Sequence, residues 1–399
     1  MKKLKKHTLI LLLTLGFITN SCIDTFDVKT IGFENALVVE ALITNEFKIH
    51  QIKLSSSFTF EEVNPQAITN AVVYITDDKG GRIDFVETFI SGEYNSNIPF
   101  AAEAGKIYQL FITTSDNNTY ESKAIPLSAI SQIDSVYVER GKNNFNENGV
   151  SIFIDSYDPT GGSNYYRYEY EETYKIIAPK WSQFDLIMTS STPPYQFDFL
   201  PKNTEKRICY KTEFSTGITL TETTDLLEDR VGKFKIRFIN NENPIISHRY
   251  SILVKQYVQS IDTYTYFKTL KKFSTPQNGI AQNQPGFFEG NMRSSNDSDR
   301  KIIGIFDVSS VSEKRMYFNY KDLFVGENLP PYFSTCGSTK PSIIPEENSP
   351  PDLVTELENG GVNFYLETGD ATAPYELVPS ACGDCTLIGT NVKPDFWYE

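Results

Sequence analysis

Residues 36–54, ALVVEALITNEFKIHQIKL, decide the fold class, because their apolar side chains recur with a period of two. The stretch from 37 to 43 is a nearly continuous apolar run. His50, Ile52 and Leu54 then share one strand face, with polar residues between them. This alternation predicts β-strands that bury one face.

Similar short segments continue the pattern as far as residue 123. We predict further strands at 71–76, 83–88, 92–94, 107–113 and 119–123, with turns at 77–81 and 116–118. Roughly seven short strands joined by turn residues are typical of an immunoglobulin-like β-sandwich. Residues 35–125 are therefore predicted to form such a domain.

A second, larger β domain is predicted over residues 131–399. Its cleanest alternation runs from Lys233 to Phe238, and further strands are expected at 302–308 and 315–320. Residues 178–206 keep no lasting period, so we interpret them as an excursion from the sheet. The tail from 322 onward is rich in Pro and Gly and is predicted to be irregular.

One helix is expected, over residues 260–273, SIDTYTYFKTLKKF. Ser260 or Asp262 can cap its start, and two lysines in the last turn complement the helix dipole. Ile261, Tyr264, Phe267 and Leu270 fall near one stripe, which we expect to face the core.

The first 21 residues have the three parts of a secretory signal peptide. Four lysines precede an apolar run that ends at Ile18, and Ser21 stands directly before Cys22. A lipoprotein signal peptidase cleaves at such a position and leaves the cysteine to carry acyl chains. We predict lipidation of Cys22, followed by a lipid-anchored tether over 22–34; the alternative is a soluble secreted protein in which Cys22 is only the first cysteine.

The mature chain is strongly acidic. Cleavage would remove four lysines, which leaves 33 Lys and Arg against 51 Asp and Glu and a formal charge of -18. Nucleic acid binding is not expected, because affinity for a polyanion depends on Lys and Arg. Attraction to an anionic membrane by charge is not expected for the same reason, and at a membrane acyl chains would hold the protein.

Four cysteines remain when Cys22 is assigned to lipid, namely Cys209, Cys336, Cys382 and Cys385. In an oxidising compartment they predict two disulfides. An irregular tail needs covalent bonds to hold it in place, so we expect Cys336 to bond Cys382 or Cys385 and Cys209 to bond the other. The alternatives are a bond between Cys382 and Cys385 and a zinc site.

The sequence offers little catalytic chemistry. After cleavage only His50 and His248 remain, and no nucleophile elbow, zincin motif or phosphate-binding loop occurs. Clusters of Asp and Asn near 77, 116, 155 and 297 lack the spacing of a calcium loop and are what turns prefer. We therefore expect no enzymatic activity, no cofactor and no metal site, although calcium binding by these clusters is left open.

Several motifs together resemble one known family. The ending runs from Cys382-Gly-Asp-Cys385 to Lys-Pro-Asp-Phe-Trp397, and it accompanies the segment that begins at Ala36 and an Ile-Asp-Ser-Val-Tyr segment at 133–137. In these features the chain resembles the family of the domain of unknown function 4249. That resemblance implies an outer-membrane lipoprotein of Bacteroidota, encoded beside TonB-dependent receptors.

The expected function follows from the signal peptide with its lipidation site and from the family resemblance together. We expect a surface-exposed outer-membrane lipoprotein that acts as an accessory subunit of a TonB-dependent receptor barrel and captures or gates its ligand. The alternatives are a surface adhesin or glycan-binding module, with a small ligand or glycan as its partner, and a structural subunit of a larger envelope complex.

Overall fold

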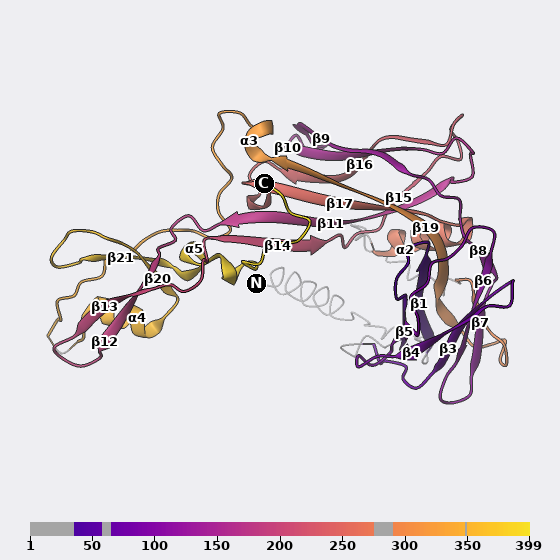
Figure 1. The fold of residues 1–399 in the computed structure, drawn as a ribbon, viewed down its shortest axis with the longest axis horizontal. Coiled ribbons are helices and arrows are strands. Elements are labelled where there is room, and N and C mark those ends of the chain that lie inside the picture. The colour runs from indigo at the N-terminus through magenta and orange to yellow at the C-terminus, as the bar shows by residue number, and fades with distance from the viewer. Residues whose placement is uncertain (1–35, 58–64, 275–289, 348) are drawn as a thin grey trace, which may run out of the picture.

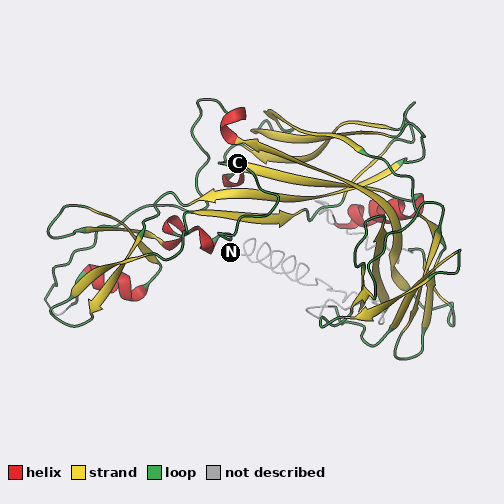
Figure 2. Ribbon diagram, in the orientation of Figure 1, coloured by secondary structure: helices red, strands yellow, loops and turns green. Residues whose placement is uncertain are grey.

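The computed structural model describes residues 36–57, 65–274, 290–347 and 349–399 (Figure 1). Strands dominate these residues, and the few helices are short apart from α2 (Figure 2). The prediction of a mainly β protein is confirmed. The signal peptide, the tether and Cys22 lie outside the described residues.

A β-sandwich-like domain forms the N-terminal part of the described chain. Neighbouring strands follow the order β1-β2-β5-β4-β3-β6-β7, and the inward residues of these strands form one buried cluster. Tyr94 and Ile52 at its centre are fully buried. The strands are β1 (Leu37–Thr44), β2 (Gln51–Ser56), β3 (Val72–Asp77), β4 (Arg82–Glu87), β5 (Glu93–Ser96), β6 (Ile107–Thr113), β7 (Thr119–Ser122) and β8 (Ile125–Pro126).

One long strand, β19 (Ile302–Asn319), joins this domain to the rest of the molecule. Its first half pairs in parallel with β1, and its second half pairs antiparallel with β17 (Arg249–Val258). Eighteen residues of strand span about 60 Å, enough to cross both parts. The sequence predicts two separate strands here, and it places neither of them beside β1.

Gly304 shows why the two strands can approach so closely. Its φ is +126°, and a Cβ atom built there would lie 2.0 Å from the carbonyl oxygen of Val39. Asn291 fixes the same strand from the other side, because its side-chain amide donates to the Phe306 carbonyl oxygen at 2.7 Å and accepts from the Phe306 N–H at 2.8 Å. Only glycine fits this position of β19 without displacing β1.

The second region packs two sheets face to face (Figure 1). The larger sheet continues in the order β14-β11-β17-β19, and the smaller one is β16-β10-β9. Four tyrosines of the larger sheet are fully buried between them, among isoleucines of β10. The remaining strands here are β9 (Ile133–Lys142), β10 (Asn148–Tyr157), β11 (Tyr165–Ile177), β14 (Ile208–Phe214), β15 (Thr219–Glu222) and β16 (Arg230–Asn240), with the short helices η1 (Pro244–Ile246) and α3 (Tyr320–Leu323). The strand β18 (Met292–Ser294) pairs instead with β7 of the N-terminal domain.

A third, smaller lobe projects from the far end of the second region (Figure 1). The excursion at 178–206 forms a hairpin, and it shares a core with the tail through Leu186, Leu353, Phe364 and Leu377. The tail is thus more regular than its sequence predicts. The elements of this lobe are β12 (Phe184–Ser190), β13 (Gln196–Pro201), α4 (Asp352–Asn359), β20 (Val362–Glu367), β21 (Tyr375–Pro379), α5 (Ser380–Gly383) and η2 (Cys385–Leu387).

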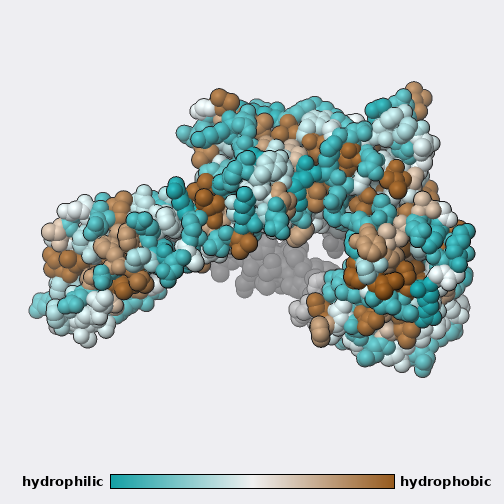
Figure 3. Space-filling view, viewed as in Figure 1, coloured by the Kyte–Doolittle hydropathy of each residue, from teal (hydrophilic) through white to brown (hydrophobic). Residues whose placement is uncertain are grey.

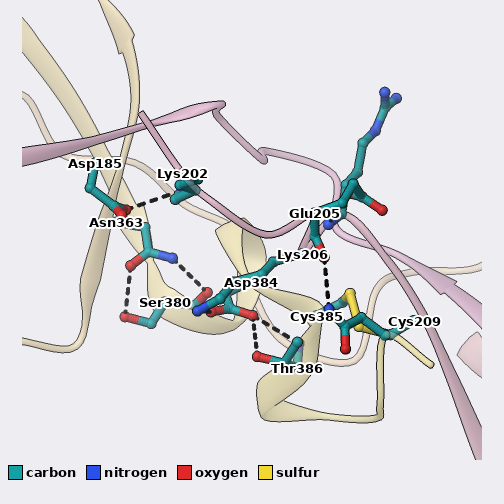
Figure 4. A network of polar contacts seen from close by, with 12 residues as sticks. Asp185, Lys202, Glu205, Lys206, Cys209, Asn363, Ser380, Asp384, Cys385 and Thr386 are labelled. Carbon is teal, nitrogen blue, oxygen red and sulfur yellow. Dashed lines mark hydrogen bonds and ion pairs between the residues drawn. A yellow bond between two sulfur atoms is a disulfide. The ribbon is translucent and has the colours of Figure 1, made fainter. Parts of the chain in front are cut away.

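Two disulfides hold the tail, in one of the two arrangements that the sequence predicts. Cys209 on β14 bonds Cys385, and Cys336 bonds Cys382. Polar contacts surround the first of these bonds (Figure 4). There the Lys206 ammonium lies 2.8 Å from the Asp384 carboxylate.

The helix α2 (Ile261–Ser274) forms where the sequence predicts it. Ser260 caps its start, because the Ser260 hydroxyl oxygen accepts from the Thr263 N–H at 3.2 Å. One detail of the predicted stripe is wrong: Ile261 is exposed, whereas Thr263 is fully buried beside Tyr264. The helix packs through the face centred on these two residues.

Candidate ligand-binding cleft

A cleft of about 620 Å³ lies where the N-terminal domain meets the second region. The outer face of β1 and β19 forms one wall, α2 forms the opposite wall, and β11 forms the base. Figure 1 shows α2 at this junction, and Figure 3 shows hydrophobic residues gathered on the N-terminal domain nearby.

The walls of the cleft are mainly apolar because of the strand period. On β1, Leu37, Val39 and Ala41 point into the sandwich core, so Val38 and Leu42 face outward. The outward face of β1 therefore presents Val38 and Leu42 on either side of the exposed Glu40. The apolar side chains of the lining are Val38, Leu42, Ile303 and Ile305 from the sheet and Tyr266, Phe267 and Leu270 from α2, and the polar side chains of Glu40, Gln51 and Lys53 lie beside them.

Arg167 on β11 is a buried cation at the base. Its side chain is 9% exposed, and its guanidinium lies 4.3 Å from the ring centre of Tyr257 and 4.8 Å from that of Phe267. It forms an ion pair with Glu169. Its Nε–H has no hydrogen-bond partner within the described part of the chain. A buried donor without a partner carries a desolvation cost that a bound acceptor would relieve.

Asp307 on β19 is a second buried charged residue of the lining, at 2% exposure. Its carboxylate accepts from the Gln259 side-chain amide at 3.1 Å and from the Ser309 hydroxyl at 2.6 Å. Burial raises the pKa of Asp307, while the charge of Arg167 opposes this shift. The base of the cleft therefore combines the Arg167–Glu169 ion pair with a carboxyl whose pKa is raised by burial.

This arrangement suits binding of a molecule with an apolar body and a small number of polar groups. The apolar walls would bury the body, and Arg167 would meet an acceptor. Neither histidine lines the cleft. His50 instead lies in the sandwich core, where its ring nitrogen Nε2 lies 3.0 Å from the Phe100 carbonyl oxygen and burial lowers its pKa.

The Asp and Asn clusters that the sequence leaves open as calcium sites form turns. Asp77 accepts from the N–H groups of Lys79 and Gly81, and Asp158 accepts from those of Thr160 and Gly162. The described residues contain no group of three or more His, Cys, Asp or Glu side chains arranged to hold a metal ion.

Arg167 and Asp307 were not predicted from the sequence as site residues. Each has a signal in hindsight: Arg167 interrupts a tyrosine-rich strand, and Asp307 stands within the apolar run 302–308. A charge inside a strand that is buried on both faces needs a partner or a function. Their meeting at one cleft depends on the pairing of β19 with β1, which the period alone does not reveal.

The structure thus defines a mainly β protein with two disulfides and an apolar cleft between its two larger parts. The family described as a domain of unknown function (DUF4249) matches residues 23–315, and the chain belongs to this family. The Cys-x-x-Cys ending lies beyond the matched residues. No curated protein matches the chain.

Among solved structures, the chain shows similarity to one described as the complete structure of manganese lipoxygenase of Gaeumannomyces graminis and partial structure of zonadhesin of Komagataella pastoris. The two are 10% identical, with a TM-score of 0.15, over 57% of this chain and 89% of the other. Similarity this low supports no inference about function.

Proposed function

We propose that this protein is a lipid-anchored outer-membrane subunit, without enzymatic activity, that captures or gates the ligand of a TonB-dependent receptor. The observation that carries the binding part of this proposal is the cleft beside α2. Its apolar walls belong to both larger parts of the molecule, and Arg167 keeps an unpartnered Nε–H, within the described residues, at its base.

The membrane part of the proposal rests on Cys22 and the signal that precedes it. Within the described residues, no helix has the length and apolar character to cross a membrane. Acyl chains on Cys22 would supply an anchor, since each buried methylene contributes about 0.8 kcal/mol and more than one chain makes the attachment stable.

A pull-down from native outer membranes tests the proposal. The protein is extracted in mild detergent through a tag at Glu399, an exposed residue at the end of the chain, and co-purifying proteins are identified. Recovery of a receptor barrel is expected. The matched control is Cys22→Ala, which removes the acylated sulfur and should abolish both membrane retention and recovery of the barrel. A chain that is recovered alone would contradict the proposal.

The alternative of a glycan-binding module gains no support from the tryptophans. Sugar platforms often use exposed aromatic rings, but Trp397 is 3% exposed and Trp181 is half-buried against the core of the second region. We therefore place the ligand site in the cleft and not on an aromatic surface.

A further inference from the structure

One end of the N-terminal domain carries a cluster of exposed hydrophobic side chains, which we call the apolar tip. It consists of Val72, Val86, Phe89 and Ile90, with exposures of 55%, 61%, 110% and 62%. Val73 pairs with Phe85, so Val72 and Val86 occupy the next opposing position on the outer face of β3 and β4. Phe89 and Ile90 follow directly in the turn between β4 and β5.

The apolar tip lies at the end of the domain where the described chain begins. Leu37 at the start of β1 pairs with Ser56 at the end of β2. The same end of β2 receives the turn between β4 and β5, because the Leu54 N–H donates to the Gly92 carbonyl oxygen at 2.8 Å. The start of β1 and the apolar tip therefore project in one direction.

We infer that the apolar tip contacts the lipid bilayer that holds the anchor, an inference that rests on the proposed attachment at Cys22. Thirteen residues lie between Cys22 and Ala36, and such a segment reaches at most about 50 Å. The end of the domain that contains Ala36 is thus the one held near the membrane. Phe, Ile and Val at this end can insert into the apolar edge of the headgroup region.

The charges beside the apolar tip agree with a hydrophobic contact. Glu87 is held within the turn, where its carboxylate accepts from the N–H groups of Asn70 and Gly92. Glu93 pairs with Lys53 at 2.7 Å. Since these carboxylates are engaged, the contact would depend on apolar insertion and only weakly on salt.

A fluorescence experiment tests this orientation. The mature chain from residue 23 carries a hexahistidine tag before Ile23, which attaches it to phosphatidylcholine vesicles that contain a nickel-chelating lipid. The variant Phe89→Trp reports the tip, and the matched control Phe145→Trp reports another exposed phenylalanine, 84% exposed, in the turn between β9 and β10. Vesicles with brominated acyl chains quench a tryptophan that enters the bilayer.

Relative to vesicles without bromine, we expect the emission that Trp at position 89 adds to that of the native tryptophans to fall at least twofold. The emission added by the control Trp should not change, and 0.5 M salt should have little effect. Added Ser substitutions at Val86 and Ile90 should reduce the quenching severalfold. Equal or absent quenching at the two positions would overturn the inference, as would protection of position 89 only when a receptor barrel is present. Because the tag replaces the acyl chains, failure here is distinct from failure of the lipid anchor.

Discussion

At the residue scale, the cleft depends on two charged side chains buried where strands of both parts meet. Arg167 is stabilised by aromatic rings on two sides and by Glu169. Asp307 is stabilised by Gln259 and Ser309. Hydrophobic replacements of buried ion pairs are often neutral or stabilising, whereas removal of one partner leaves an uncompensated buried charge.

Asp307→Asn should change how stability depends on pH. The folded pKa of Asp307 is raised above its ordinary 3.8, so its protonated form favours the folded state. The free energy of unfolding of the wild type, relative to that of the variant, should therefore fall as the pH rises from about 4 through the folded pKa. The expected fall is about 1.4 kcal/mol for each pH unit between the unfolded and the folded pKa. Urea unfolding at several pH values measures this difference; parallel curves for the two proteins would contradict it.

Trp397→Ala should destabilise the second region. Trp397 is buried edge-on against Tyr210 and Tyr317, and the Tyr317 hydroxyl donates to the Phe396 carbonyl oxygen at 2.6 Å. Loss of a buried tryptophan costs about 3–5 kcal/mol, and Trp397→Phe should cost less because the ring contacts are partly kept. Chemical unfolding of both variants measures the effect; a cost below about 1 kcal/mol for alanine would show that the ending does not hold the tail.

At the element scale, the disulfides differ in what they restrain. Cys209–Cys385 closes 176 residues and ties the tail to β14, whereas Cys336–Cys382 closes 46 residues within the tail. Chain-entropy reasoning assigns more stabilisation to the longer loop, by about 1 kcal/mol.

Replacing both cysteines of one bond with serine tests this order. Removal of Cys209–Cys385 should lower the unfolding free energy by about 1 kcal/mol more than removal of Cys336–Cys382, measured by urea unfolding without reductant. Equal losses, or a larger loss for the shorter loop, would contradict this expectation.

The period of two was sufficient to predict most strands and the mainly β class, because alternation is a local property. The helix at 261–274 was predictable for the same reason, through its Ser260 cap and its final lysines. The third lobe was not, since its core joins residues of the excursion to residues of the tail. The cleft was also hidden, because the pairing of β19 with β1 is non-local.

At the scale of the whole molecule, β19 makes the two larger parts share one sheet. Its parallel pairing with β1 and antiparallel pairing with β17 place the cleft beside the junction. The second region and the third lobe extend away from the N-terminal domain (Figure 1). In our proposal the apolar tip faces the bilayer.

The mass of the complex extracted from native outer membranes tests the central claim most directly. Native mass spectrometry of the tagged protein in mild detergent should show a particle that contains this chain and one receptor barrel in equal numbers, with acyl mass on Cys22. A particle that contains only this chain, across several mild detergents, would contradict the account of an accessory receptor subunit.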